Sequence, residues 1–211
     1  MTNGLLWAGL GGELELRQDA NGAKRLSGSF PYRKRAVLSD GGRRGRPQKE
    51  EFDERAFAYR VEDPQAEIHF LVGHSYDRPL ARKLDGTLRL RDTPLALLFE
   101  AFIARELAEV SHVRDALALI SAGLATGVSP GFRLPPERAV PREEAEEITE
   151  EPDNPEEGEH RAIIRKIKQA LLFELSLVTA PAYPEAQVEA RNWSPTIATP
   201  RARSYLRRWR L

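Results

Sequence analysis

A long, apolar and extended stretch at residues 161–178 constrains the fold of this chain more than any other segment. Large and branched apolar side chains surround a single acid, Glu174, and the prolines Pro181 and Pro184 end the run. This pattern is typical of buried strands, because proline cannot continue a sheet ladder. The acid is therefore either a charge on an edge strand that faces water or a carboxylate with a function.

Other segments also follow strand patterns. Residues 13–17 alternate in hydropathy, and residues 24–32 resume an extended pattern after an Asn-Gly turn signal, which predicts a hairpin. Residues 67–74 predict a buried strand. Residues 79–83 and 87–91 flank an Asp-Gly turn signal and predict a second hairpin.

Helical patterns are fewer. Residues 106–120 place apolar side chains three and four positions apart, which predicts an amphipathic helix that Gly123 and Gly127 end. Residues 94–103 are apolar at nearly every position and fit either a strand or a buried helix. The expected fold class is therefore α+β, mainly β.

Composition limits the possible classes of protein. The chain has 211 residues, 41% of them hydrophobic, which predicts one domain of ordinary size with charged ends. It has no cysteine, so disulfides, thiolate metal sites and a cysteine nucleophile are excluded. The formal net charge is zero, so no overall field favours nucleic acid. No apolar run approaches a membrane span or a signal peptide, and we expect a cytoplasmic protein.

The charges are segregated along the chain. We expect a loose leader at 1–12, a folded domain at 13–190 and a basic tail at 191–211. Within the domain, residues 137–159 carry acidic runs with few large apolar residues, which predicts an exposed, mobile loop. A second, glycine-rich loop at 39–49 is basic.

Three polar residues occur in or at the ends of predicted strands: His74, Ser129 and Glu174. Acyl transfer needs a base, a nucleophile and an acid that orients the base. Each residue also has a plainer interpretation. His74 fits a hydrogen-bonded histidine at a strand end, Ser129 a turn serine, and Glu174 a solvated edge charge. Residue types alone do not decide between these readings.

Three segments that contain these residues resemble the prohead protease family of tailed phages: residues 72–80 (VGHSYDRPL), 128–132 (VSPGF) and 174–183 (ELSLVTAPAY). The resemblance extends over about residues 26–190. It implies a serine endopeptidase with a closed β-barrel of the herpesvirus serine protease type and helices around it. It also implies that Ser129 is the nucleophile and His74 the general base.

Glu174 is the expected third catalytic residue, and His69, His112 and His160 are poorer candidates. Pro130 replaces the small or branched residue that is usual in the family, so one N–H that could bind an oxyanion is missing. No cofactor or metal is expected, since the four histidines do not cluster and no His-Glu-x-x-His motif occurs.

The resemblance implies that the chain acts in the host cytoplasm, inside the assembling prohead. The implied substrates are the major capsid protein and its scaffold segment, with self-cleavage that removes the basic tail as a further expectation. A homodimer is an open expectation for herpesvirus-like proteases. The alternative function is a catalytically silent capsid or scaffold module that binds acidic partners or DNA through residues 43–46 and the basic tail.

Overall fold

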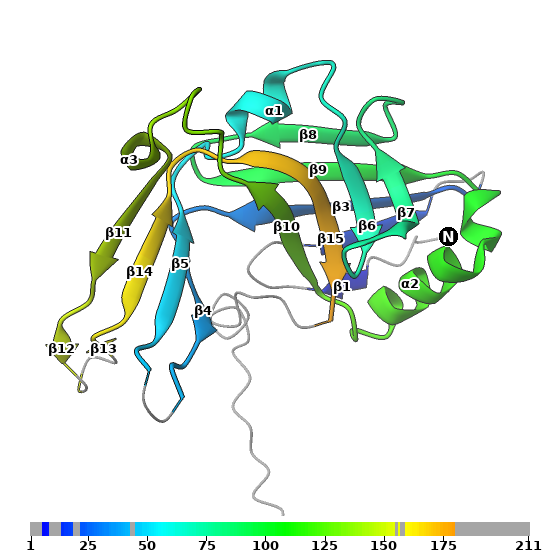
Figure 1. Cartoon of the computed structure of the whole chain (residues 1–211). Helices are drawn as coiled ribbons and strands as arrows, with labels where there is room; N and C mark the ends of the chain where they lie inside the picture. Colours follow the sequence, from blue (N-terminus) through cyan, green and yellow to red (C-terminus); the bar gives the residue numbers. More distant parts are fainter. Residues whose placement is uncertain are drawn as a thin grey trace, which may run out of the picture.

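The computed structural model describes residues 6–8, 14–18, 22–42, 45–154, 156 and 159–179. A five-stranded and a four-stranded sheet pack face to face with crossing strands, and a second four-stranded sheet extends from one side of them (Figure 1). The longest helix lies beside the opposite end of the molecule, next to β7 in Figure 1.

The back sheet is antiparallel throughout, in the order β1-β2-β3-β9-β8. Its strands are β1 Leu6–Ala8, β2 Leu14–Gln18, β3 Lys24–Pro31, β9 Ala96–Ile103 and β8 Leu88–Asp92. The pairing of β2 with β3 confirms the first predicted hairpin. Residues 94–103, which fitted a strand or a helix, contain the eight-residue strand β9, buried at every second position.

The front sheet has the order β10-β15-β6-β7. Its strands are β10 Gly127–Arg133, β15 Leu171–Val178, β6 His69–Val72 and β7 Ser75–Arg82. β15 runs antiparallel to β10 but parallel to β6, so the strand that carries Glu174 is central in this sheet. A register shift between Gly131 and Phe132 marks a bulge in the β10–β15 pair.

The side sheet has the order β11-β14-β5-β4. Its strands are β11 Glu146–Glu150, β14 Ile163–Ile167, β5 Gln48–Phe52 and β4 Arg35–Ser39. A two-stranded ladder of β12 Asp153–Asn154 and β13 Glu159–His160 lies next to it in Figure 1. β14 and β15 follow each other in the chain, yet they belong to different sheets.

The described helices are short: α1 Ala58–Glu62, the 3-10 turn η1 Leu107–Glu109, α2 Ser111–Ser121 and α3 Arg142–Ala145. The helix predicted at 106–120 is therefore divided, because Val110 is extended and separates η1 from α2. Gly123, with φ of 69°, follows the end of α2 as predicted for a left-handed residue after a helix.

The main core lies between the back and front sheets. Leu26, Leu97 and Phe99 contribute from the back sheet, and Phe70 and Leu175 contribute from the front sheet. An aromatic cluster joins the side sheet to this core: the ring of Phe52, at the end of β5, lies 5.4 Å from Phe30, 5.0 Å from Phe57 and 4.9 Å from Phe132 between centroids. The core thus holds β10 against the other sheets on the face away from Ser129.

The expected closed barrel is wrong. The described strands form four separate sheets, and each of these has two edge strands. The second predicted hairpin, at residues 79–83 and 87–91, is also wrong. Residues Asp85 and Gly86 do form a turn, but β7 pairs with β6 and β8 pairs with β9, so the strands on either side enter different sheets. No ladder therefore joins β7 to β8, although such pairing would link the front and back sheets.

The acidic segment at 137–159 also differs from its expected loop form, since its described residues include α3, β11, β12 and the first residue of β13. Glu146 and Glu151 are only 5% and 6% exposed. Arg165 donates to Glu146 at 2.5 Å and Lys49 donates to Glu151 at 2.7 Å. Basic side chains of β14 and β5 let this acidic stretch enter and follow a sheet, because a paired carboxylate can be buried at lower cost.

The expected leader at 1–12 is described only at residues 6–8, which form β1. The basic tail at 191–211, together with Arg43 and Arg44 of the basic loop, lies outside the described residues. The domain bounds 13–190 stay a prediction.

Candidate active site

The turn between β6 and β7 holds His74 in an unusual backbone conformation. Gly73 and His74 both have positive φ, 61° and 60°, and connect the paired residues Val72 and Ser75. Two consecutive positive φ values fit a two-residue hairpin turn whose twist matches that of the flanking strands. Glycine adopts such a conformation freely, and histidine is one of the few other residues found there. The turn thus presents the imidazole at the end of the front sheet.

β15 holds this turn in place. The Gly73 amide donates to the Leu177 carbonyl at 3.0 Å, and the His74 amide donates to Ser176 Oγ at 2.9 Å. A strained backbone persists only where its surroundings fix it, and these two bonds come from the central strand of the sheet. The position of His74 therefore depends directly on β15.

Glu174 lies buried on β15 and contacts His74. Its carboxylate Oε1 is 2.7 Å from His74 Nδ1, and its Oε2 accepts a hydrogen bond from Ser176 Oγ at 2.6 Å. The glutamate is 4% exposed, whereas the His74 side chain is 46% exposed. Glu174 is thus not the solvated edge charge that was its plainer interpretation. A carboxylate at Nδ1 fixes the tautomer that carries its proton there, so Nε2 is free to accept one.

Gly131 provides the space for this carboxylate. It lies opposite Glu174 in the β10–β15 pair, and a Cβ added to it would be 1.9 Å from Glu174 Oε1. Any larger residue at position 131 would displace the carboxylate. The glycine of the Ser-x-Gly-Phe segment is therefore explained by the side chain that passes over it.

Ser129 lies on the same face of the sheet as Glu174. It is paired with Ser176 across the β10–β15 ladder, two residues along β10 from Gly131. Directly opposed residues of an antiparallel pair project from the same face. The fold thus places Ser129 on the sheet face that carries Glu174, directly across from Ser176, the residue that accepts a hydrogen bond from the His74 amide. Among the described residues no hydrogen bond joins Ser129 to His74, a contact that often forms only with substrate bound.

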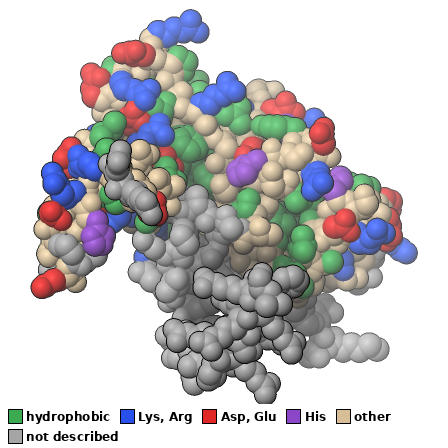
Figure 2. Space-filling model, turned by 60° about the horizontal axis from the view of Figure 1, so that its bottom comes forward, with side chains coloured by type: hydrophobic (Ala, Val, Ile, Leu, Met, Phe, Trp, Pro, Cys, Tyr) green, Lys and Arg blue, Asp and Glu red, His purple; other side chains and the backbone are tan. Residues whose placement is uncertain are grey.

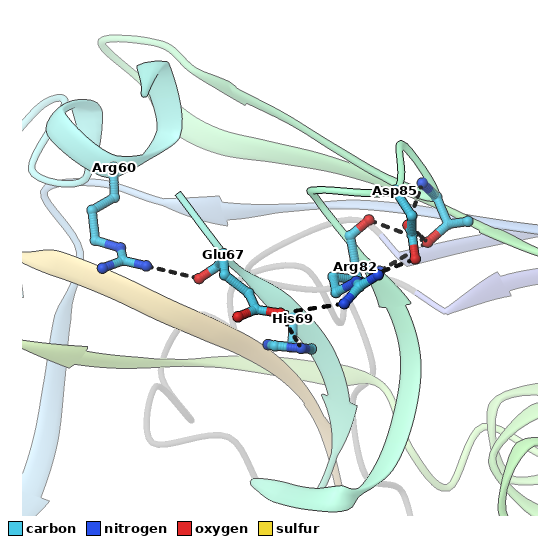
Figure 3. A network of polar contacts seen from close by, with 6 residues as sticks. Arg60, Glu67, His69, Arg82 and Asp85 are labelled. Atoms are coloured by element: carbon cyan, nitrogen blue, oxygen red, sulfur yellow. Dashed lines mark hydrogen bonds and ion pairs between the residues drawn. The ribbon is translucent and has the colours of Figure 1, made fainter. Parts of the chain in front are cut away.

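The other histidines are engaged elsewhere. His69 Nε2 lies 3.5 Å from Glu67 Oε1, and its ring packs edge-on against Tyr76 with centroids 5.5 Å apart. Figure 3 shows His69 in a polar network that continues from Glu67 to Arg82 and Asp85, at the start of β6 and the end of β7. His112 Nε2 lies 3.0 Å from the Pro79 carbonyl oxygen, and His160 is exposed on β13. The described contacts bring none of the three to Ser129.

Two residues of this site were missed by the sequence reasoning, Ser176 and Gly131. Both lie inside the segments quoted for their resemblance, but neither was assigned a role. The signal available was their spacing, since Gly131 and Ser176 each lie two positions from a candidate catalytic residue and so share its face of a strand.

Two other kinds of site have no counterpart in the described part of the chain. Its residues contain no group of three or more histidine and acidic side chains that could hold a metal ion, and none of its helices is long and apolar enough to cross a membrane. On the face seen in Figure 2, basic and acidic side chains of the described residues are intermingled. Arg46, the described arginine of the basic loop, donates to Glu150 Oε1 at 2.9 Å and to the Arg161 carbonyl at 2.7 Å.

An acid that orients a histidine beside a strand serine is the arrangement that serine peptidases use. The family model described as caudovirus prohead serine protease matches residues 42–198, and the chain belongs to this family of serine peptidases. The match confirms the resemblance on which the sequence interpretation relied. No curated protein and no solved structure matches the chain significantly.

Proposed function

We propose that this chain is a serine endopeptidase that processes the major capsid protein and its scaffold segment during prohead maturation. Ser129 is the nucleophile, His74 the general base, and Glu174 the acid that orients the histidine. The observation that carries this proposal is the 2.7 Å contact between His74 Nδ1 and Glu174 Oε1 on the sheet face that also bears Ser129. Membership of the prohead serine protease family supports the choice of substrates.

The reaction follows from the orientation of the imidazole. The Nδ1–H group stays protonated and donates a hydrogen bond to Glu174, so the lone pair of Nε2 accepts the hydroxyl proton as Ser129 Oγ attacks the scissile carbonyl. His74 then returns that proton to the leaving amine, which departs and leaves an acyl-enzyme. A water molecule, activated in the same way, hydrolyses the ester. The buried Glu174 carboxylate stabilises the imidazolium that forms twice in this cycle.

The oxyanion of the tetrahedral intermediate needs N–H donors, and Pro130 limits where they come from. Proline has no N–H, so the residue directly after Ser129 cannot donate one. The donors are then the Ser129 amide or groups from another segment.

The reaction takes place inside the assembling prohead in the host cytoplasm, where the concentration of capsid and scaffold chains is high. The family assignment supports this location. Self-cleavage within the basic tail at 191–211 belongs to the same proposal, because that segment follows the last described strand.

Co-expression with the capsid protein of the same phage tests the proposed function. Wild type and Ser129→Ala are compared by intact mass, with Ser121→Ala as the matched control because Ser121 is an exposed serine at the end of α2. We expect wild type and Ser121→Ala to shorten the capsid protein and Ser129→Ala to leave it intact. Equal masses with wild type and Ser129→Ala, in folded protein, contradict the proposal.

A further inference from the structure

Ser176 makes two hydrogen bonds in the site, and each involves a different member of the proposed catalytic set. Its hydroxyl donates to Glu174 Oε2 at 2.6 Å and accepts from the His74 amide at 2.9 Å. The residue is 0% exposed. A serine hydroxyl has one proton, so the proton given to Glu174 is not available to any base.

These contacts distinguish Ser176 from a nucleophile. A nucleophilic serine donates its hydrogen bond to the base, whereas Ser176 donates to the acid and accepts a hydrogen bond from the backbone N–H of His74. It lies directly opposite Ser129 in the β10–β15 ladder. Only Ser129 of this pair retains a hydroxyl without a described partner, so the two serines have different tasks.

The two bonds fix the relative position of the acid and the base. Glu174 has two carboxylate oxygens, and with Oε1 at His74 and Oε2 at Ser176 its plane cannot rotate without breaking a buried bond. The His74 backbone, at φ of 60°, is anchored to the same hydroxyl. One buried oxygen therefore holds both ends of the His74–Glu174 contact.

We propose that Ser176 is a positioning residue for the peptidase reaction, which sets the carboxylate of Glu174 and the turn of His74 in a single arrangement. The inference rests on the proposed function and adds a residue to it. Ser176 does not contact the substrate. Its loss should slow proton transfer from Ser129 without weakening the binding of a ligand.

A fluorophosphonate probe measures this step without knowledge of the natural cleavage site. The serine oxygen attacks phosphorus, a P–O bond forms, the P–F bond breaks and fluoride leaves, while the hydroxyl proton passes to His74 Nε2. Peptide mass mapping identifies the labelled serine. The labelling rate is measured at increasing probe concentrations. Its plateau gives the maximal labelling rate, and the concentration at half of that rate gives the apparent affinity for the probe.

Ser176→Thr and Ser176→Val form the matched pair, because their side chains have the same shape and only threonine has a hydroxyl. We expect Thr to label at Ser129 about 10- to 100-fold faster than Val, the range that follows when the Glu174 carboxylate and the His74 amide both lose their hydrogen bond to the buried hydroxyl. The apparent affinity for the probe should be the same in both. Equal labelling rates in folded Thr and Val variants would overturn the inference.

A second comparison separates positioning from general damage to the fold. In the Glu174→Gln background, the difference between Thr and Val should shrink to less than about threefold, because residues that act as a unit are not additive. A purely structural role would keep the difference unchanged. If the Val variant does not fold, as judged by circular dichroism, Ser176→Ala takes its place with the same expected loss.

The outcomes for Ser129 and Ser176 are distinguishable. If the Ser129→Ala variant is labelled at the same rate as the wild type, the proposed function itself is overturned. Loss of labelling in that variant, with equal rates for Ser176→Thr and Ser176→Val, overturns only the positioning role. Labelling mapped to Ser176 overturns both.

Discussion

His74 Nδ1 and Glu174 Oε1 lie 2.7 Å apart although the two residues are 100 positions apart in the chain. One residue lies in a turn with positive φ and the other on the central strand of the front sheet. The parallel pairing of β15 with β6 brings them together, because it places the end of β6 beside the second half of β15. The contact thus results from the order of the strands in the front sheet.

Replacement of Glu174 by glutamine should remove most of the activity. The amide keeps the shape of the carboxylate but no longer fixes the productive imidazole tautomer, and the corresponding change in a serine protease lowers kcat by about 10⁴-fold. We expect a loss on the order of 10³- to 10⁴-fold in capsid protein cleavage or fluorophosphonate labelling. Glu106→Gln is the control, since Glu106 is exposed. A loss below about tenfold would contradict the orienting role.

Replacement of Gly131 by alanine should affect both stability and activity. The new Cβ would overlap Glu174 Oε1, so the carboxylate or the β10 backbone must move. We expect a destabilisation of about 1–3 kcal/mol in urea unfolding, typical of overpacking, together with a loss of probe labelling. Gly86→Ala serves as the control, because its positive φ strains the backbone while its Cβ meets open space. That variant should lose stability but keep its labelling rate.

The buried pair of Tyr32 and Asp92 should contribute to stability. The Tyr32 hydroxyl donates to Asp92 Oδ1 at 2.6 Å, and Asp92 Oδ2 has no partner among the described residues. Burial raises the pKa of Asp92 above its usual value, and the hydrogen bond from Tyr32 opposes this. Tyr32→Phe should cost about 1–3 kcal/mol at neutral pH, because it leaves a buried carboxylate without a donor.

The pH dependence of that loss has a defined sign. A carboxyl group whose pKa is raised by folding binds more protons when folded, so its contribution to stability falls as the pH rises through its unfolded and folded pKa values. The Tyr32 hydrogen bond favours the charged form of Asp92, so its removal should raise the pKa of Asp92 further. The cost of Tyr32→Phe should therefore be smaller at acidic pH, where Asp92 is protonated, than at neutral pH. Tyr59→Phe is the control, since Tyr59 is exposed. An equal cost at both pH values would contradict this account.

Glu146 should make the side sheet sensitive to acid. Burial raises the pKa of this carboxyl group, but hydrogen bonds from Arg165 and Arg142 outweigh that effect and hold it below the usual value. Stability from such a group is present above its unfolded pKa and is lost as the pH falls through its folded pKa. Glu146→Gln should cost about 1–3 kcal/mol in urea unfolding at neutral pH, since it removes charged hydrogen bonds.

The difference between wild type and Glu146→Gln should shrink as the pH is lowered below the usual range of a glutamate. Urea unfolding at neutral and acidic pH checks this, with Glu143→Gln on the exposed side of α3 as the matched control. A difference that stays constant over the whole pH range would show that the arginines do not stabilise the charged form of Glu146.

Local patterns in the sequence were sufficient for several elements. Alternation predicted the β2–β3 hairpin, and helical spacing predicted α2, in which Val113, Ala116, Leu117 and Ile120 are buried. Periodicity did not distinguish a strand from a helix at residues 94–103, because a run that is apolar at nearly every position fits both a buried strand and a buried helix. It also did not predict β11, where Arg165 of the neighbouring strand β14 pairs with the buried Glu146.

The sequence by itself determined the β2–β3 hairpin, the mainly β class and, through three short segments, the family and the candidate residues His74, Ser129 and Glu174. Only the tertiary structure decided that the sheets stay separate, that β15 runs beside β6, and that Gly131 and Ser176 complete the setting of Glu174. The physical reason is that periodicity reports the environment of one strand, whereas strand neighbours depend on the packing of the whole core.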